Sequence, residues 1–144
     1  MPGEQLHLTV AFIGALGHEP GRALAQALAA QARPVAAAPV AHVEYWPGVA
    51  RPRLMVATFA MTDAFVELDW RVRSLMIGLG LSVDARAFRP HITLARFGRL
   101  AHDVARETPA FTPFVAHFDA LMLYSSTLAA RGAQYRALAH VPLR

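Results

Sequence analysis

HLTVAFIG at residues 7–14 returns, with small changes, as HITLARFG at residues 91–98. In both copies His, Thr, Ala and Gly stand at the same offsets, and the residues that follow His and Thr are apolar: Leu8, Val10, Ile92 and Leu94. Because side chains alternate between the two faces of a strand, each His shares a face with its Thr, and these apolar residues lie on the opposite face. Both stretches are therefore predicted to be strands that carry a polar pair on one face.

The two polar pairs, His7 with Thr9 and His91 with Thr93, suit one kind of chemistry. One imidazole can take a proton from an attacking water while the other gives a proton to the departing oxygen. The threonine hydroxyls can donate to the nonbridging oxygens of a phosphate, where charge accumulates. A single His-x-Thr is ordinary in a strand, since Thr favours strands. Its repetition favours metal-free phosphodiester cleavage, if the two strands are equivalent elements of two pseudo-symmetric halves that meet at a cleft.

The rest of the chain is predicted to be α+β. With 144 residues, 55% hydrophobic and 17% charged, residues 1–144 are expected to form one folded domain. Strands outnumber helices, and the short connections favour antiparallel pairing. Thr62 is the expected N-cap of the longest helix, which Gly78 and Gly80 end. The expected helices are 22–32, 62–79 and 100–107; the expected strands are 6–13, 35–46, 54–59, 81–88, 91–97, 114–124 and 134–141, with loops at 17–21, 47–52 and 125–132.

Composition excludes several classes of function. The absence of cysteine excludes disulfides, thiolate zinc sites, iron-sulfur clusters and a cysteine nucleophile. No apolar run is long enough to span a membrane, and a cytoplasmic location is expected. The net charge is +4 and every lysine-or-arginine position is arginine. This permits a phosphate-bearing partner, but the base composition of the encoding genome is the favoured explanation. The charge is scattered, so a large duplex-binding face is not expected.

The tetrapeptides HLTV and HITL resemble the paired HxTx signatures of the 2H phosphoesterase superfamily. The most similar branch is the bacterial one called 2′-5′ RNA ligase or RNA 2′,3′-cyclic phosphodiesterase. The flanking stretches also agree, so the resemblance runs along essentially the whole chain. These stretches are Arg89-Pro90, Ala95-Arg96-Phe97, residues 123–128 and residues 132–135.

The resemblance implies a fold and a reaction. The fold is bilobal, with two pseudo-symmetric antiparallel sheets and flanking helices around a central cleft that carries the two motifs. The reaction is hydrolysis of a 2′,3′-cyclic phosphate to a 2′-phosphomonoester, with 2′-5′ ligation as its reverse. His7 corresponds to the proton donor and His91 to the proton acceptor. Thr9 and Thr93 correspond to the residues that hold the phosphate oxygens.

Three further residues are expected to contact substrate. Arg96 corresponds to an arginine associated with nucleotide contact. Strict alternation places Arg96 on the Ile92 face, so a bulge or a strand end is required to bring it to the face of His91. Tyr45, with its neighbour Trp46, could stack on a base at the cleft rim, and packing is the alternative. Arg131 could reach a phosphate, and a solvated loop position is the alternative.

Partners and competing functions follow from the same comparison. The expected substrates are RNA ends or cyclic nucleotides, with no cofactor and no metal, because His7 and His91 lack a third ligand. Family members carry a strand and a helix before the first motif. Three explanations are open for this chain: the true start lies upstream, the chain is shortened, or this is a reduced variant. A reduced variant is expected to leave a sheet edge exposed, which a second copy covers in a homodimer. The alternatives to this enzyme are a noncatalytic nucleotide-binding module and a metal-dependent hydrolase.

Overall fold

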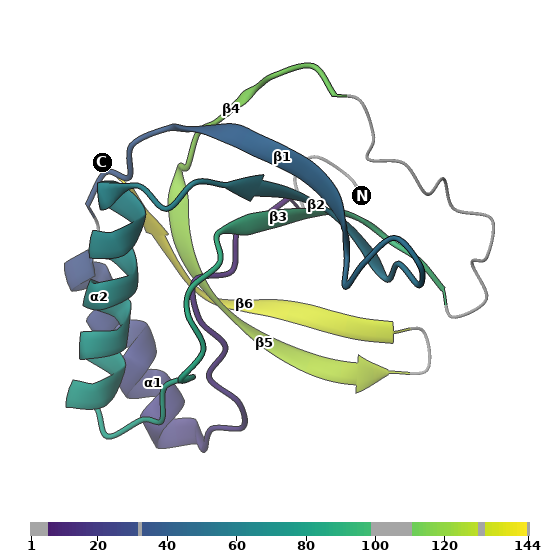
Figure 1. Cartoon of the computed structure of the whole chain (residues 1–144). Helices are drawn as coiled ribbons and strands as arrows, with labels where there is room; N and C mark the ends of the chain where they lie inside the picture. The colour runs from purple at the N-terminus through teal and green to yellow at the C-terminus, as the bar shows by residue number, and fades with distance from the viewer. Residues whose placement is uncertain (1–5, 32, 99–110, 130–131, 144) are drawn as a thin grey trace. The chain divides into compact units, whose positions relative to one another are not determined.

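The structure is a computed structural model, and it describes residues 6–31, 33–98, 111–129 and 132–143. It has few helices and two antiparallel sheets, which confirms the α+β class (Figure 1). The contacts divide the chain into two compact units. Unit 1 takes its residues from 1–10, 37–66 and 86–117, and unit 2 from 11–36, 67–85 and 118–144.

Unit 1 is built on a sheet with the strand order β3-β2-β1-β4 (Figure 1). All its strand pairs are antiparallel. The predicted loop at 47–52 joins β1 and β2, which pair with each other as a hairpin, and β2 has the predicted bounds. The Trp46–Pro47 peptide bond is cis. The strands are β1 (Ala38–Trp46), β2 (Leu54–Phe59), β3 (His91–Arg96) and β4 (Val115–Ala116).

The core of unit 1 lies against one face of this sheet and is closed by aromatic rings. Val43, Ala57 and Ile92 are neighbours across β1, β2 and β3, and all three are buried. Phe65, which is only 1% exposed, lies with its ring 6.0 Å from that of Phe59 and 6.2 Å from that of Phe88. These ring contacts attach the first turn of the following helix to the sheet.

Three predicted strands are wrong. In residues 6–13 only Leu8 is paired, in an isolated bridge to Ile92, and the chain passes from unit 1 to unit 2 after Val10. Residues 81–88 form no strand, because β3 already occupies the edge of β2. The stretch 114–124 is divided between β4 and the start of a strand in the other sheet. In each case the pairing depends on which distant strand occupies an edge.

The long helix α2 (Asp63–Gly78) confirms the predicted helix. The hydroxyl of Thr62 accepts a hydrogen bond from the Phe65 amide at 3.3 Å, as an N-cap residue does. At the other end Gly80 has φ of +76°, and the Leu81 amide donates to the Met76 carbonyl at 2.9 Å. This is a Schellman ending, which favours glycine because the left-handed conformation strains residues with a side chain.

Replacing Thr62 by alanine is expected to lower the free energy of unfolding by about 1 kcal/mol, because the Phe65 amide loses its acceptor. Urea denaturation followed by circular dichroism measures the change. Thr62→Ser is the control, since it keeps the hydroxyl and should lose much less. Equal losses in the two variants would mean that the hydroxyl does not cap the helix.

Unit 2 begins with α1 (His18–Ala27), which continues as the 3₁₀ helix η2 (Leu28–Gln31). The predicted loop at 17–21 is wrong, since the helix already starts at His18. Pro20 lies in the first turn, where its missing N–H leaves no hydrogen bond unmade. The remaining strands, β5 (Ala120–Ala129) and β6 (Gly132–Pro142), form the second sheet and run into the predicted loop at 125–132.

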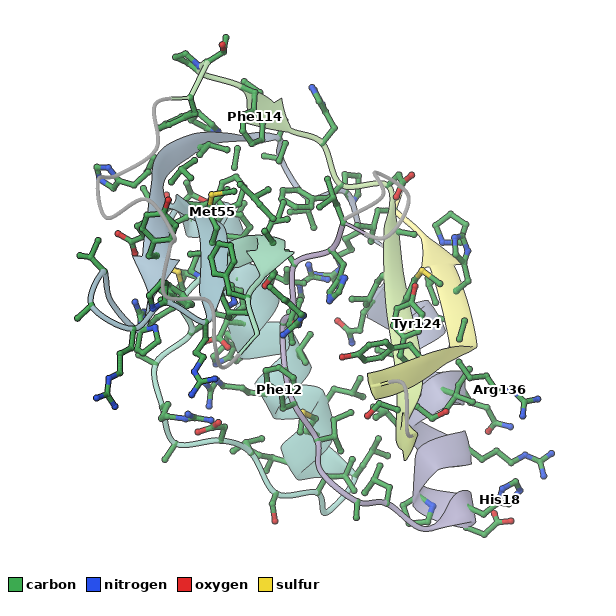
Figure 2. All side chains as sticks on the ribbon, turned by 90° about the vertical axis from the view of Figure 1, so that its right-hand side faces the viewer. Phe12, His18, Met55, Phe114, Tyr124 and Arg136 are labelled. Atoms are coloured by element: carbon green, nitrogen blue, oxygen red, sulfur yellow. The ribbon has the colours of Figure 1, made fainter. Side chains whose placement is uncertain are left out.

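The β5–β6 ribbon carries an exposed aromatic pair. Tyr124 on β5, labelled in Figure 2, contacts Tyr135 on β6 edge to face, with ring centroids 6.3 Å apart. The predicted helix at 100–107 lies outside the described residues. No helix in the described part of the chain is long and apolar enough to cross a membrane.

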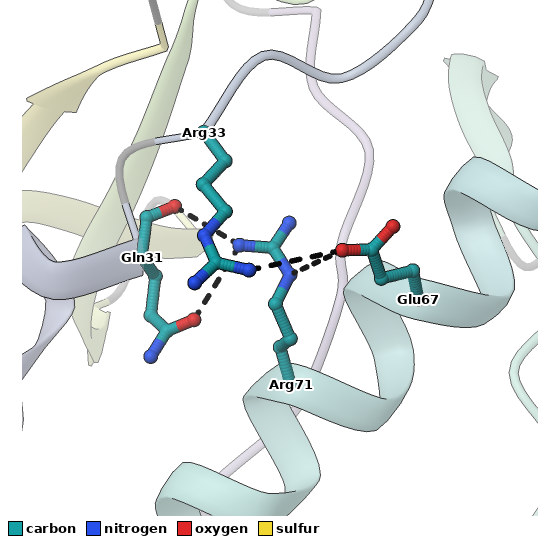
Figure 3. A network of polar contacts seen from close by, with 4 residues as sticks. All are labelled: Gln31, Arg33, Glu67 and Arg71. Carbon is teal, nitrogen blue, oxygen red and sulfur yellow. Dashed lines mark hydrogen bonds and ion pairs between the residues drawn. The ribbon is translucent and has the colours of Figure 1, made fainter.

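A polar network joins the end of η2 to α2 within unit 2 (Figure 3). Arg71 is buried, and its Nη1 donates to the carbonyl and to the side-chain oxygen of Gln31, both at 3.4 Å. The Glu67 carboxylate lies 3.8 Å from Arg71 and 3.8 Å from Arg33. Burial makes the Arg71 contacts structurally important, because an unpaired buried charge is costly.

Candidate active site

The two His-x-Thr motifs are neighbours in unit 1. Leu8 pairs with Ile92 in an antiparallel bridge. Continuing this register by one residue in each direction places His7 opposite Thr93 and Thr9 opposite His91. Residues opposite each other in an antiparallel pair point to the same face, so this register, if continued, assigns the four polar side chains to one face.

The first motif lies beside the second. Both belong to unit 1, and the bridge from Leu8 to Ile92 joins the first motif to β3. His7 is exposed, and Thr9, His91 and Thr93 are half-buried. None of the four residues is fully buried.

A bulge in β3 determines where Arg96 lies. Thr93 pairs with Val56 and Ala95 pairs with Met55, so Leu94 is the extra residue on β3. Arg96 then pairs with Leu54, which has the same parity along β2 as Val56. Arg96 consequently lies on the face of Thr93 and His91, whereas strict alternation without the bulge would place it on the opposite face.

The ring of His91 is oriented by its own chain. Its Nδ1 lies 2.7 Å from the carbonyl oxygen of Arg89. A carbonyl oxygen can only accept, so Nδ1 donates this bond. In the neutral ring Nε2 then carries the lone pair, which is the form a proton acceptor needs.

Trp46 contacts the same histidine. Its ring centroid is 4.4 Å from that of His91. The indole N–H donates to the Glu44 carboxylate at 2.7 Å, and the Arg89 guanidinium carbon lies 4.1 Å from the Trp46 ring centroid. Glu44 and Trp46 pair with Val56 and Leu54, so they lie on the face of the motif residues.

An open pocket of about 430 Å³ adjoins this cluster in unit 1. It combines two guanidinium groups, one carboxylate and an aromatic wall. Sequence reasoning assigned no role to Glu44, Arg53 or Arg89. The period-two spacing of Glu44 and Trp46 was the one local signal that they share a face. The lining residues are Glu44, Tyr45, Trp46, Pro47, Arg53, Leu54 and Arg89.

Tyr45, one of the predicted contact residues, is not brought to His91. Tyr45 pairs with Met55 and so lies on the other face, where its ring is 6.1 Å from that of Phe97, although it also borders the pocket. Arg131 lies outside the described residues. Within the described ranges, no group of three or more His, Cys, Asp or Glu side chains is placed to hold a metal ion.

Comparison with known proteins gives consistent matches. The family model described as LigT-like phosphoesterase matches residues 61–135, a stretch that contains the second motif. The crystal structure of TT0787 of Thermus thermophilus is 28% identical, covers 100% of this chain and 81% of its own, and has a TM-score of 0.69.

Escherichia coli LigT gives similar values in two complexes. With 3′-AMP it is 26% identical, with 97% of this chain and 78% of that chain covered and a TM-score of 0.69. With NADP⁺ it is 25% identical, with 97% and 77% covered and a TM-score of 0.67. No curated protein sequence matches the chain.

Proposed function

Because the chain belongs to the LigT-like phosphoesterase family of the 2H phosphoesterase superfamily, we propose that it hydrolyses 2′,3′-cyclic phosphates at RNA or nucleotide ends. The product is a 2′-phosphomonoester, and no metal ion takes part. The observation that supports the proposal is the antiparallel bridge between Leu8 and Ile92, which brings the two His-x-Thr motifs side by side. Residues 1–144 act as one cytoplasmic domain in which unit 1 supplies these residues.

In the proposed reaction water attacks phosphorus as the bond to the 3′ oxygen breaks. His91 takes the proton of the water through Nε2, which the bond from Nδ1 to Arg89 leaves free. His7 gives a proton to the departing 3′ oxygen. Thr9 and Thr93 donate to the nonbridging oxygens, and Arg96, on the same face, attracts the phosphate charge. A ribose 5′-hydroxyl that attacks in place of water breaks the same bond to the 3′ oxygen and yields a 2′-5′ linkage.

A noncatalytic nucleotide-binding module is the second candidate. It is favoured by the two E. coli LigT structures that hold 3′-AMP and NADP⁺, since both ligands are nucleotides. Under this reading the face of the motif residues binds a nucleotide without turnover. The two candidates differ in whether the native chain forms any product.

The deciding experiment is hydrolysis of a 2′,3′-cyclic nucleotide in the presence of a chelator, with the phosphomonoester identified by ³¹P NMR. The proposal expects a 2′-phosphate at an undiminished rate. A rate that disappears with the chelator would favour metal-dependent hydrolysis. Binding without any product would favour the module.

The rate of this hydrolysis is expected to be bell-shaped in pH. One histidine must be neutral to accept a proton and the other protonated to donate one, so kcat/KM falls on both sides of an optimum. The measurement is kcat/KM between about pH 5 and 8, where histidine ordinarily changes charge. A flat profile across that range would contradict the acid-base pair.

A further inference from the structure

The pocket beside His91 contains side chains that the proposed reaction does not use. Arg53 and Arg89 line it together with Trp46 and Glu44. The pocket begins one side chain away from the reacting histidine, because the Trp46 ring contacts both His91 and the guanidinium of Arg89. A group bound here would therefore be next to, and not at, the cleaved phosphate.

The Trp46 ring holds Arg89 in place. Its N–H is bonded to Glu44 at 2.7 Å, which restrains the indole, and the Arg89 guanidinium lies 4.1 Å from the ring centroid. A guanidinium that stacks on a ring keeps its N–H donors free at its own edge. Arg89 is exposed, so these donors are open to a ligand from solvent.

The chemistry of the pocket favours a phosphate over a nucleobase. A guanidinium and the His91 ring already contact the Trp46 ring, so the indole is engaged in holding them. The two guanidinium groups outnumber the single carboxylate, and one oxygen of that carboxylate accepts the indole N–H. Planar donor pairs match the oxygens of a phosphodiester, which carries one negative charge.

From these observations, and resting on the proposed function, we propose that Arg53 and Arg89, with Arg89 held by the Trp46 ring, bind the phosphodiester adjacent to the cyclic phosphate. The site then distinguishes an RNA chain end, which has such a phosphodiester, from a free cyclic mononucleotide, which has none. The preferred substrate is therefore a polynucleotide with a 2′,3′-cyclic end.

The kinetic test compares kcat/KM for a short RNA with a 2′,3′-cyclic end and for the cyclic mononucleotide. In Arg89→Gln and in Arg53→Gln the ratio of the two values is expected to fall about tenfold, as for the loss of one charge-assisted contact. Arg51→Gln is the matched control, because Arg51 is exposed in the same loop as Arg53 but does not line the pocket. An unchanged ratio in both pocket variants would overturn the subsite.

A binding measurement tests the subsite without turnover. The chain has two tryptophans, and Trp70 is 68% exposed, so Trp70→Phe leaves Trp46 as the single tryptophan reporter. Titration with a short RNA that ends in a 2′-phosphate should change its fluorescence. The slope of log affinity against log salt should fall in magnitude by about 0.7 in Arg89→Gln, one single-strand phosphate contact.

The two measurements separate failure of the subsite from failure of the proposed function. If neither substrate is hydrolysed but the fluorescence titration shows the expected salt slope, the reaction is wrong and the subsite stands. If hydrolysis proceeds and the salt slope is the same in Arg89→Gln as in the native chain, the subsite is overturned and the reaction stands.

Discussion

Replacing His91 by alanine is expected to lower kcat for hydrolysis of a 2′,3′-cyclic nucleotide by about 10²- to 10⁴-fold, the range for loss of a general acid or base. His91→Asn should lose as much. Its amide can still donate to the Arg89 carbonyl, which orients the side chain, but it cannot accept a proton at neutral pH. The measurement is kcat under saturating substrate, with circular dichroism to show that each variant is folded.

The control for His91 is His42→Ala. His42 pairs with Thr58, which also pairs with His91, so the two histidines share a face of the same sheet. Only His91 belongs to a motif. Equal losses in the two alanine variants would mean that removing any imidazole from this face impairs the protein, and the base assignment would be wrong.

His7→Ala should cause a loss within the same range, and the leaving group identifies its role. An aryl phosphodiester departs without needing a proton, so its hydrolysis depends little on a general acid. On that substrate the His7 variant should regain most of its activity and the His91 variant should not. Recovery in the His91 variant alone would reverse the two assignments.

Phe65→Ala is expected to lower the free energy of unfolding by about 3 to 5 kcal/mol, the usual cost of removing a buried aromatic ring. Phe65 is 1% exposed and contacts the rings of Phe59 and Phe88. Folded domains are stable by only about 5 to 15 kcal/mol, so this is a large part of the total. Urea denaturation measures it.

Val66→Ala is the matched control for Phe65, because it follows it on α2 and is 51% exposed. It should change the unfolding free energy by no more than about 0.5 kcal/mol. Phe65→Leu keeps the site apolar and should fall between the two, which provides a measurable variant if the alanine variant does not fold. A loss in Phe65→Ala as small as that in Val66→Ala would mean that the aromatic cluster does not stabilise unit 1.

Elements with strong local signals were predictable. The cap at Thr62 and the glycines at positions 78 and 80 predicted the two ends of α2, and β2 has the predicted bounds. These signals act within one helix or strand, so they are visible in a single sequence. The stretches 6–13 and 81–88 have equally strong strand patterns. Whether they form strands depends on a free edge of a distant strand to pair with, and β3 already occupies the edge of β2.

The candidate site divides in the same way. Strand alternation alone placed each histidine on the face of its threonine, because that relation is local. The tertiary structure decided the rest. It pairs Leu8 with Ile92, and the bulge at Leu94 brings Arg96 to the face of His91. It also places Trp46 against Arg89 and His91. These features depend on register and packing between segments far apart in the chain, which no local period encodes.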